Sequence, residues 1–122
     1  CDVFSPNALG AILDDAGIAA LDCPIVAGGA NNQLARPEHG ALLAARGILY
    51  APDYVINAGG IISVATEYLA RRDSRTGNVA EVNALVEQIP GRLETIWQES
   101  ESTGVSSDVV ADRMAQKLIG RG

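Results

Sequence analysis

Three asparagines are the side chains in this sequence best suited to bind a small polar ligand. Asn31 and Asn32 follow the apolar run at residues 24–27, and Asn57 follows a second such run at residues 48–50. A primary amide has donors and an acceptor on one small group, so it can bind a carboxamide, a carboxylate or an amine. The three asparagines therefore indicate a binding site made of amides, provided that both runs end at the same edge of the fold.

The elements that would position these amides are predicted from short apolar runs that end in small residues. Such runs are typical of buried parallel strands, and they cover residues 2–4, 24–27 and 48–50. Residues 8–21 are predicted to form a short loop and then a helix. Two more helices are predicted at residues 37–46 and about 55–72. In an open parallel sheet the ligand lies outside the carboxyl ends of the strands, so the three asparagines would share one crevice.

Charged and turn-forming residues mark the ends of the first two helices. Asp14 and Asp15 suit the start of the first helix, where acidic side chains are favourable. Pro37 suits the first position of the second helix, and Gly47 suits its end. The predicted core contacts of the first helix are Ile12, Ile18 and Leu21. Helical spacing in the third helix predicts one common face for Ile61, Val64, Ala65 and Tyr68.

After a polar linker at residues 71–78, the sequence predicts two more helices. Asn78 would cap a long helix, whose apolar residues keep a three-four rhythm past Pro90 and so favour a kink there over two separate helices. The last helix follows a polar break at residues 99–104. Ser106 or Ser107 would cap its start, with Asp108 in the first turn. Lys117 and Arg121 would lie near its end.

The order of elements predicts an α/β fold: the second half of a doubly wound Rossmann-type parallel sheet, with three strands, followed by two C-terminal helices. We expect residues 1–76 to form the C-terminal half of a dinucleotide-binding domain, and residues 77–122 to form a helical segment that packs on it. The other half is expected upstream, because no G-x-G-x-x-G phosphate turn occurs here and the chain opens inside a predicted strand. The strand that contains Val3 would then expose its edge.

Composition limits the classes of function. The chain has 122 residues, enough for one domain, and its net charge of -6 with nine scattered Lys and Arg residues argues against a nucleic-acid partner. No apolar run approaches the ~20 residues that cross a bilayer, and no signal peptide is recognisable. The two cysteines, Cys1 and Cys23, lack disulfide or metal-binding patterns and are predicted to be buried, which fits a cytoplasmic location.

The segments CDVFSPNALG, AGGANNQLA and GILYAPDYVINAGG, in this order and spacing, resemble the cofactor domain of the leucine/phenylalanine/valine dehydrogenases, which are glutamate dehydrogenase-like amino-acid dehydrogenases. The resemblance covers residues 1–70 most strongly and the terminal helices less. It implies reversible oxidative deamination of an apolar L-amino acid to its 2-oxo acid and ammonia, with hydride passed to NAD. It also implies an upstream substrate domain that supplies two lysines and an aspartate, and a homo-oligomer.

The resemblance also implies roles for individual residues. Asn31 would hold the nicotinamide carboxamide, Asn32 the head group of the substrate, and the turn at residues 6–8 would lie beside the nicotinamide ribose. Many members have Cys where this chain has Asn7. The implied cofactor-binding residues are Pro6, Asn7, Ala8 and Asn31. The implied substrate-binding residues are Asn32, Asn57, Gly59, Gly60, Ile61 and Val64, with Ala58 in the same helix start. The apolar pair Ile61 and Val64, three apart on one helix, argues against glutamate as substrate.

The chain itself lacks a residue that could perform the deamination. Its single lysine, Lys117, lies far along the sequence from the asparagines, whereas an imine route needs a lysine of lowered pKa, or a comparable base, beside the α-carbon. No metal-binding or Ser-His-Asp pattern occurs either. We therefore expect an enzyme whose catalytic residues lie upstream of this chain. The acidic residue that distinguishes NAD from NADP is expected upstream as well. The alternative is a stand-alone, non-catalytic α/β module that binds a nucleotide or a protein.

Ordinary structural roles stay open for several of these residues. The asparagine pair could form a simple turn, and Ile61 and Val64 could be plain core residues. Residues with no expected catalytic role are His39 and Arg71–Arg72, predicted to be solvated, and Trp97, Tyr50 and Tyr54, predicted to pack.

Overall fold

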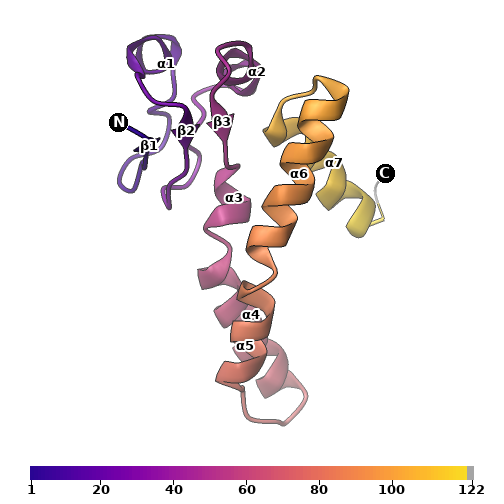
Figure 1. Ribbon diagram of the computed structural model, residues 1–122. Coiled ribbons are helices and arrows are strands. Elements are labelled where there is room, and N and C mark those ends of the chain that lie inside the picture. Colours follow the sequence, from indigo (N-terminus) through magenta and orange to yellow (C-terminus); the bar gives the residue numbers. More distant parts are fainter. Residues whose placement is uncertain (121–122) are drawn as a thin grey trace.

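A three-stranded parallel sheet lies at one end of the molecule and a helical hairpin projects from the other (Figure 1). The computed structural model describes residues 1–120. The strands are short and lie in the order β1 (Val3–Phe4), β2 (Ile25–Val26) and β3 (Leu49–Tyr50). The helices are α1 (Asp15–Ala20), α2 (Glu38–Ala45), α3 (Asp53–Ile56), α4 (Gly59–Arg72), α5 (Val79–Val86), α6 (Ile89–Thr103) and α7 (Ser107–Leu118). The α/β prediction, with three parallel strands, is confirmed.

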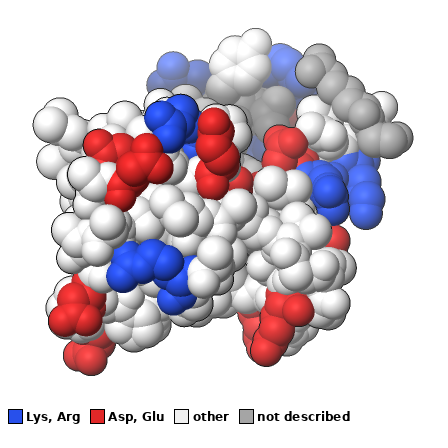
Figure 2. Space-filling model, turned by 90° about the horizontal axis from the view of Figure 1, so that it is seen from above, with Lys and Arg blue, Asp and Glu red and all other residues white. Residues whose placement is uncertain are grey.

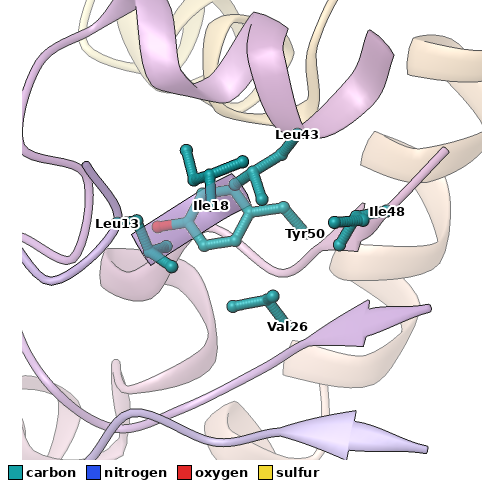
Figure 3. Packing of buried hydrophobic residues seen from close by; sticks show 6 residues of the cluster. All are labelled: Leu13, Ile18, Val26, Leu43, Ile48 and Tyr50. Carbon is teal, nitrogen blue, oxygen red and sulfur yellow. The ribbon is translucent and has the colours of Figure 1, made fainter. Parts of the chain in front are cut away.

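One hydrophobic cluster lies where α1 and α2 cover the sheet. Figure 3 shows its side chains gathered around the ring of Tyr50; they are Leu13, Ile18, Val26, Leu43, Ile48 and Tyr50. The predicted contacts of Ile18 and Leu21 are confirmed, but Ile12 is 43% exposed and Leu13 is buried instead. The segment before α1 is extended, since Leu13 bridges to Leu34. Alternate residues of an extended segment face opposite sides, so only one of the pair can point inward.

A second cluster joins the end of β3 to α3, α6 and α7. Its buried members are Ala51, Val55, Leu93, Ile96, Val110 and Ala111. The carbonyl oxygen of Tyr50 accepts hydrogen bonds from Trp97 Nε1 and Ser107 Oγ, both at 2.9 Å. Trp97 packs against the cluster, as predicted. These bonds cover the outer edge of β3, which would otherwise expose unpaired backbone groups.

Two of the predicted helices are each divided. The helix predicted over residues 55–72 is α3 followed by α4, because the ladder is interrupted at Asn57 and Ala58. The predicted kink at Pro90 is wrong, because α5 ends at Val86 and α6 begins at Ile89. Pro90 lies in the first turn of α6, where its missing N–H removes no helical hydrogen bond. Residues 77–120 therefore contain three helices rather than the two predicted.

The helix ends mostly follow the prediction. Asp14 caps α1 by accepting a hydrogen bond from Gly17 N at 2.6 Å, and Asn78 caps α5 by accepting one from Ala80 N at 2.9 Å. Gly47 follows α2 with a positive φ of 67°. Ser106 occupies the cap position of α7 but makes no side-chain capping bond. The predicted contribution of Arg121 lies outside the described residues.

The hairpin of α4 and α5 leaves most of its apolar side chains exposed. Thr66 and Ala70 are the buried residues of α4, whereas Ile61 and Val64 are 67% and 63% exposed. The interpretation of these two residues as plain core is therefore wrong. The common face predicted for α4 exists, but within residues 1–120 it faces outward.

The surface agrees with the charge pattern of the sequence. Figure 2 shows acidic and basic side chains interspersed on the face seen from above. Arg71 and Arg72 are solvated at the end of α4, in ion pairs with Glu67 and Asp73. Cys23 is buried as predicted, but Cys1 is exposed because it precedes β1 at the edge of the sheet. None of the helices within residues 1–120 has the length and apolar character needed to cross a bilayer.

Candidate functional site

The loops that leave the three strands meet at the backbone of Gly29. The N–H of Gly29 donates to Asn7 Oδ1 at 2.8 Å, and Asn57 Nδ2 donates to the carbonyl of Gly29 at 3.3 Å. Asn57 Nδ2 also donates to Asn31 Oδ1 at 2.6 Å. We call Asn7, Asn31 and Asn57 around Gly29 the amide cluster. It lies at the carboxyl ends of parallel strands, where ligands bind in open α/β sheets.

Hydrogen bonding fixes the direction of each amide in the cluster. The carbonyl of Gly29 can only accept, so the Asn57 nitrogen must face it. The same nitrogen then faces Asn31, so Asn31 presents its oxygen to Asn57. Among the described residues, Asn31 Nδ2 donates no hydrogen bond, and Asn31 is exposed. The cluster therefore offers one outward N–H donor group, which suits a carbonyl or carboxylate oxygen.

Asn7 has a structural role within the cluster. Its Nδ2 donates to the carbonyl and the hydroxyl of Ser5, both at 2.9 Å, while its Oδ1 accepts from Gly29. The side chain is thus engaged at both ends and joins the exit of β1 to the exit of β2. Any contact of this turn with a ligand is left to the exposed main chain at Asn7 and Ala8.

Asn32 lies beside the cluster but is not bonded to it. Its backbone is left-handed, with φ of 52°, and its carbonyl accepts from Ala11 N at 2.7 Å. Asparagine tolerates this conformation better than most residues. Asn32 lines a neighbouring cleft of about 330 Å³, together with Leu34, Ala35, Arg36, Pro37, Tyr50, Pro52, Asp53, Tyr54, Asp108 and Asp112. The structure therefore brings Asn31 and Asn57 into contact and places Asn32 next to them.

Glycines shape the surroundings of the cluster in two ways. A Cβ on Gly28 would collide with the carbonyl of Pro6, so the loop after β2 packs directly on the turn after β1. A Cβ on Gly60 would meet nothing within 4 Å, so the start of α4 leaves open space. Gly59 is half-buried at the start of the same helix, while Ile61 and Val64 lie on its exposed face.

Two buried polar residues under the cluster escaped sequence reasoning. Gln33 is fully buried, and its Nε2 donates to the carbonyls of Gly28 and Ala30 at 2.7 and 2.9 Å. Asp53 accepts from the backbone N–H groups of Gln33 and Tyr54 at 2.7 and 2.6 Å. The available signal was their position: each follows a predicted strand within the loops that carry the asparagines.

The two tyrosines of the cleft are not suited to act as bases at neutral pH. Burial, with smaller contributions from the charges of Asp112, Asp108 and Asp53, raises the pKa of Tyr54 to about 12. Burial also raises the pKa of Tyr50 well above its ordinary value. Both phenols therefore stay protonated near pH 7, and the residues that line the cleft include no lysine. Lys117 lies in the last turn of α7.

His39 is buried rather than solvated as predicted. Its ring is 2% exposed, Nδ1 accepts from the N–H of Arg36 at 3.0 Å, and Nε2 lies 3.5 Å from Asp15 Oδ1. A ring that accepts at Nδ1 carries no proton there. His39 thus serves the start of α2. No group of side chains in residues 1–120 has an arrangement that could hold a metal ion.

Comparison with known proteins settles the family. A model of the glutamate/leucine/phenylalanine/valine dehydrogenases matches residues 1–120. The chain belongs to this family. The leucine dehydrogenase of Thermoactinomyces intermedius is 45% identical over 98% of the chain, and the phenylalanine dehydrogenase of Bacillus thermotolerans is 41% identical over 97%.

The solved structures agree with the family assignment. The L-tryptophan dehydrogenase of Nostoc punctiforme superposes on 98% of the chain with a TM-score of 0.87 and 39% identity, and the match covers 34% of that protein. The glutamate dehydrogenase of Peptoniphilus asaccharolyticus, at 22% identity and a TM-score of 0.64, shares the fold. The chain spans 31% and 29% of the leucine and phenylalanine dehydrogenases named above, so it corresponds to about a third of these relatives.

Proposed function

We propose that this chain is part of an NAD-dependent dehydrogenase that reversibly deaminates an apolar L-amino acid to its 2-oxo acid and ammonia. The observation that carries the proposal is the amide cluster, in which three strand exits converge and one donor group points outward. Family membership supports the class of reaction, and relatives named for leucine, phenylalanine and tryptophan support apolar substrates.

The residues of the site fit a nicotinamide and an amino acid side by side. Asn31, with its free Nδ2, would donate to the oxygen of the nicotinamide carboxamide. The main chain at Asn7 and Ala8 would lie against the nicotinamide ribose, while Pro6, which is buried, would hold the turn in place through its carbonyl bond to Ala30 N. NAD, when bound, accepts the hydride from the α-carbon; the residues of this chain supply position, which is the larger part of what a protein adds to hydride transfer.

Substrate would be held by the residues next to the cofactor. Asn32 would bind the charged head group. Asn57, Gly59 and Gly60 would border the bound substrate without adding bulk. Ile61 and Val64 would face the substrate side chain. Their exposure supports this, since an apolar pair on an open helix face would gain by covering an apolar side chain.

The remaining chemistry belongs to residues outside this chain. The base for deamination and the phosphate-binding turn would come from an upstream substrate domain and the first half of the cofactor domain. We further propose that residues 1–76 complete that cofactor domain, that residues 77–122 pack on it, and that the enzyme is a cytoplasmic homo-oligomer.

The test is a single substitution in the full-length product of the gene. Asn32→Ala is expected to lower kcat/KM for leucine, valine, phenylalanine or tryptophan by about tenfold or more, the effect of one lost hydrogen bond to a charged group. Asn83→Ala, which changes an exposed asparagine of α5, serves as the control and should leave kcat/KM unchanged. Wild-type kinetics in the Asn32→Ala enzyme would refute the role of Asn32, and an inactive wild type would refute the reaction.

A further inference from the structure

A buried polar pair, Gln33 and Asp53, joins the loop after β2 to the start of α3. Gln33 is fully buried and Asp53 is 9% exposed. One carboxylate oxygen of Asp53 accepts from Gln33 N at 2.7 Å, and the other accepts from Tyr54 N at 2.6 Å. Both bonds are charge-assisted, hence shorter and stronger than neutral ones. Together they fix the distance between two loops that are 20 residues apart in sequence.

The side chain of Gln33 also determines the shape of its own loop. Its Nε2 donates to the carbonyls of Gly28 and Ala30, at 2.7 and 2.9 Å. Two converging carbonyls can be satisfied only by a donor, so an acidic or apolar residue could not replace the amide. These carbonyls flank Gly29, whose backbone N–H and carbonyl form the centre of the amide cluster.

We propose that Gln33 and Asp53 are positioning residues for the amide cluster. By holding the loop after β2 against α3, they bring Asn57 within bonding distance of Asn31, and so direct Asn31 Nδ2 outward. The consequence for catalysis rests on the proposed function, whereas the geometry can be tested in this chain alone. A purely structural role would change stability without changing how Asn31 and Asn57 meet.

The geometric test uses NMR spectroscopy of the isotope-labelled chain of 122 residues. Wild type should show cross-peaks between the side-chain protons of Asn31 and Asn57. Asp53→Asn keeps the size of the side chain but sets an NH₂ group against a backbone N–H, so these cross-peaks should be lost while the helical circular dichroism is retained. Glu99→Gln neutralises another partly buried carboxylate, in α6, and should keep them.

Two results would overturn the proposal: cross-peaks of wild-type intensity in the Asp53→Asn chain, or their equal loss in the Glu99→Gln chain. If Asp53→Asn prevents folding, the proposal is tested on the wild-type chain by hydrogen exchange in urea. The Gln33 backbone amide should then lose its protection from hydrogen exchange at the same urea concentration that abolishes the cross-peaks. Loss of the cross-peaks while Gln33 stays protected would contradict the proposal.

Kinetics of the full-length product provide a second test. Asp53→Asn should lower kcat/KM for the amino acid about 10- to 100-fold, as expected when reacting groups are misplaced by about 1 Å, while Glu99→Gln should not. Unchanged kinetics in Asp53→Asn would refute the positioning role. An inactive wild type would refute the proposed function instead, and the NMR result would still decide the geometry.

Discussion

At the residue scale, the three amides of the cluster have different tasks because their hydrogen bonds point in different directions. Asn7 is engaged at both ends inside the protein, and Asn57 spends its nitrogen on Gly29 and Asn31. Asn31 alone among these three keeps an outward nitrogen within residues 1–120. The amide proposed to bind the cofactor is thus oriented by a neighbour that is itself oriented by the backbone.

Tyr54 gives a prediction about alkaline pH. Its pKa is raised from 10 to about 12, first by burial and then by the nearby aspartates. A raised pKa in the folded state adds stability that is fully present below pH 10 and is lost as pH rises towards 12. The free energy of unfolding, measured with urea at constant ionic strength, should therefore be flat near pH 9 and fall above pH 10.

Tyr54→Phe separates this effect from general alkaline denaturation. The variant has no phenol at this position, so its stability should fall less steeply than that of wild type between pH 10 and 12. Tyr50, whose pKa is also raised, would account for part of the remaining slope. Identical slopes for the two proteins would show that Tyr54 is not linked to folding.

Some residue roles could be predicted from sequence and others could not. The asparagines were recognisable because they follow strands, and family resemblance supplied their proposed roles. Gln33 and Asp53 were not recognised, because a polar residue in a loop is usually exposed and only tertiary contacts bury it. His39 was misplaced for the same reason: its burial depends on α1, which lies against α2.

At the element scale, the start of α2 depends on a histidine. His39 Nδ1 accepts from Arg36 N at 3.0 Å, so the ring binds the backbone of the residue that precedes the cap of α2 and fixes how the chain enters the helix. Arg36 in turn pairs with Asp15 of α1 at 2.8 Å. The group links two helices that cover the same part of the sheet.

Two substitutions of His39 test this link. His39→Leu fills the buried space without an acceptor and should lower the free energy of unfolding by about 2 kcal/mol, since it leaves the backbone N–H of Arg36 unpaired. His39→Asn offers an oxygen near the position of Nδ1 and should cost less. Urea unfolding at pH 8 measures both, and equal losses would show that packing, not the hydrogen bond, is what His39 provides.

The positions of the elements followed the sequence better than their boundaries. Apolar runs located all three strands, and capping residues located most helix starts. The breaks at Asn57 and Pro90 were missed because the hydrophobic rhythm runs on through both. The helix breaks at Asn57, whose side chain bonds to the loop after β2. At Pro90 the sequence is ambiguous, because proline suits the first turn of a new helix as well as a kink.

At the scale of the whole molecule, the two edges of the sheet differ. The edge at β3 is covered by Trp97 and Ser107, while β1 has no strand on its outer side within residues 1–120. The hairpin of α4 and α5 stands away from the sheet with its apolar face open (Figure 1). Both features agree with a chain that spans about a third of its relatives. The open edge of β1 was predicted from sequence, whereas the exposure of the apolar face of α4 was not.

The central claim is that the strand exits place an amide donor, Asn31 Nδ2, against the carboxamide of the nicotinamide. The most direct measurement compares NAD with its thionicotinamide analogue, whose sulfur is a weaker acceptor than oxygen, in the full-length enzyme and its Asn31→Ala variant. Wild type should favour NAD in kcat/KM by about five- to tenfold, the effect of one neutral hydrogen bond. In Asn31→Ala the ratio of kcat/KM for NAD to kcat/KM for the analogue should fall close to one. An unchanged ratio would contradict the proposed contact between Asn31 and the carboxamide.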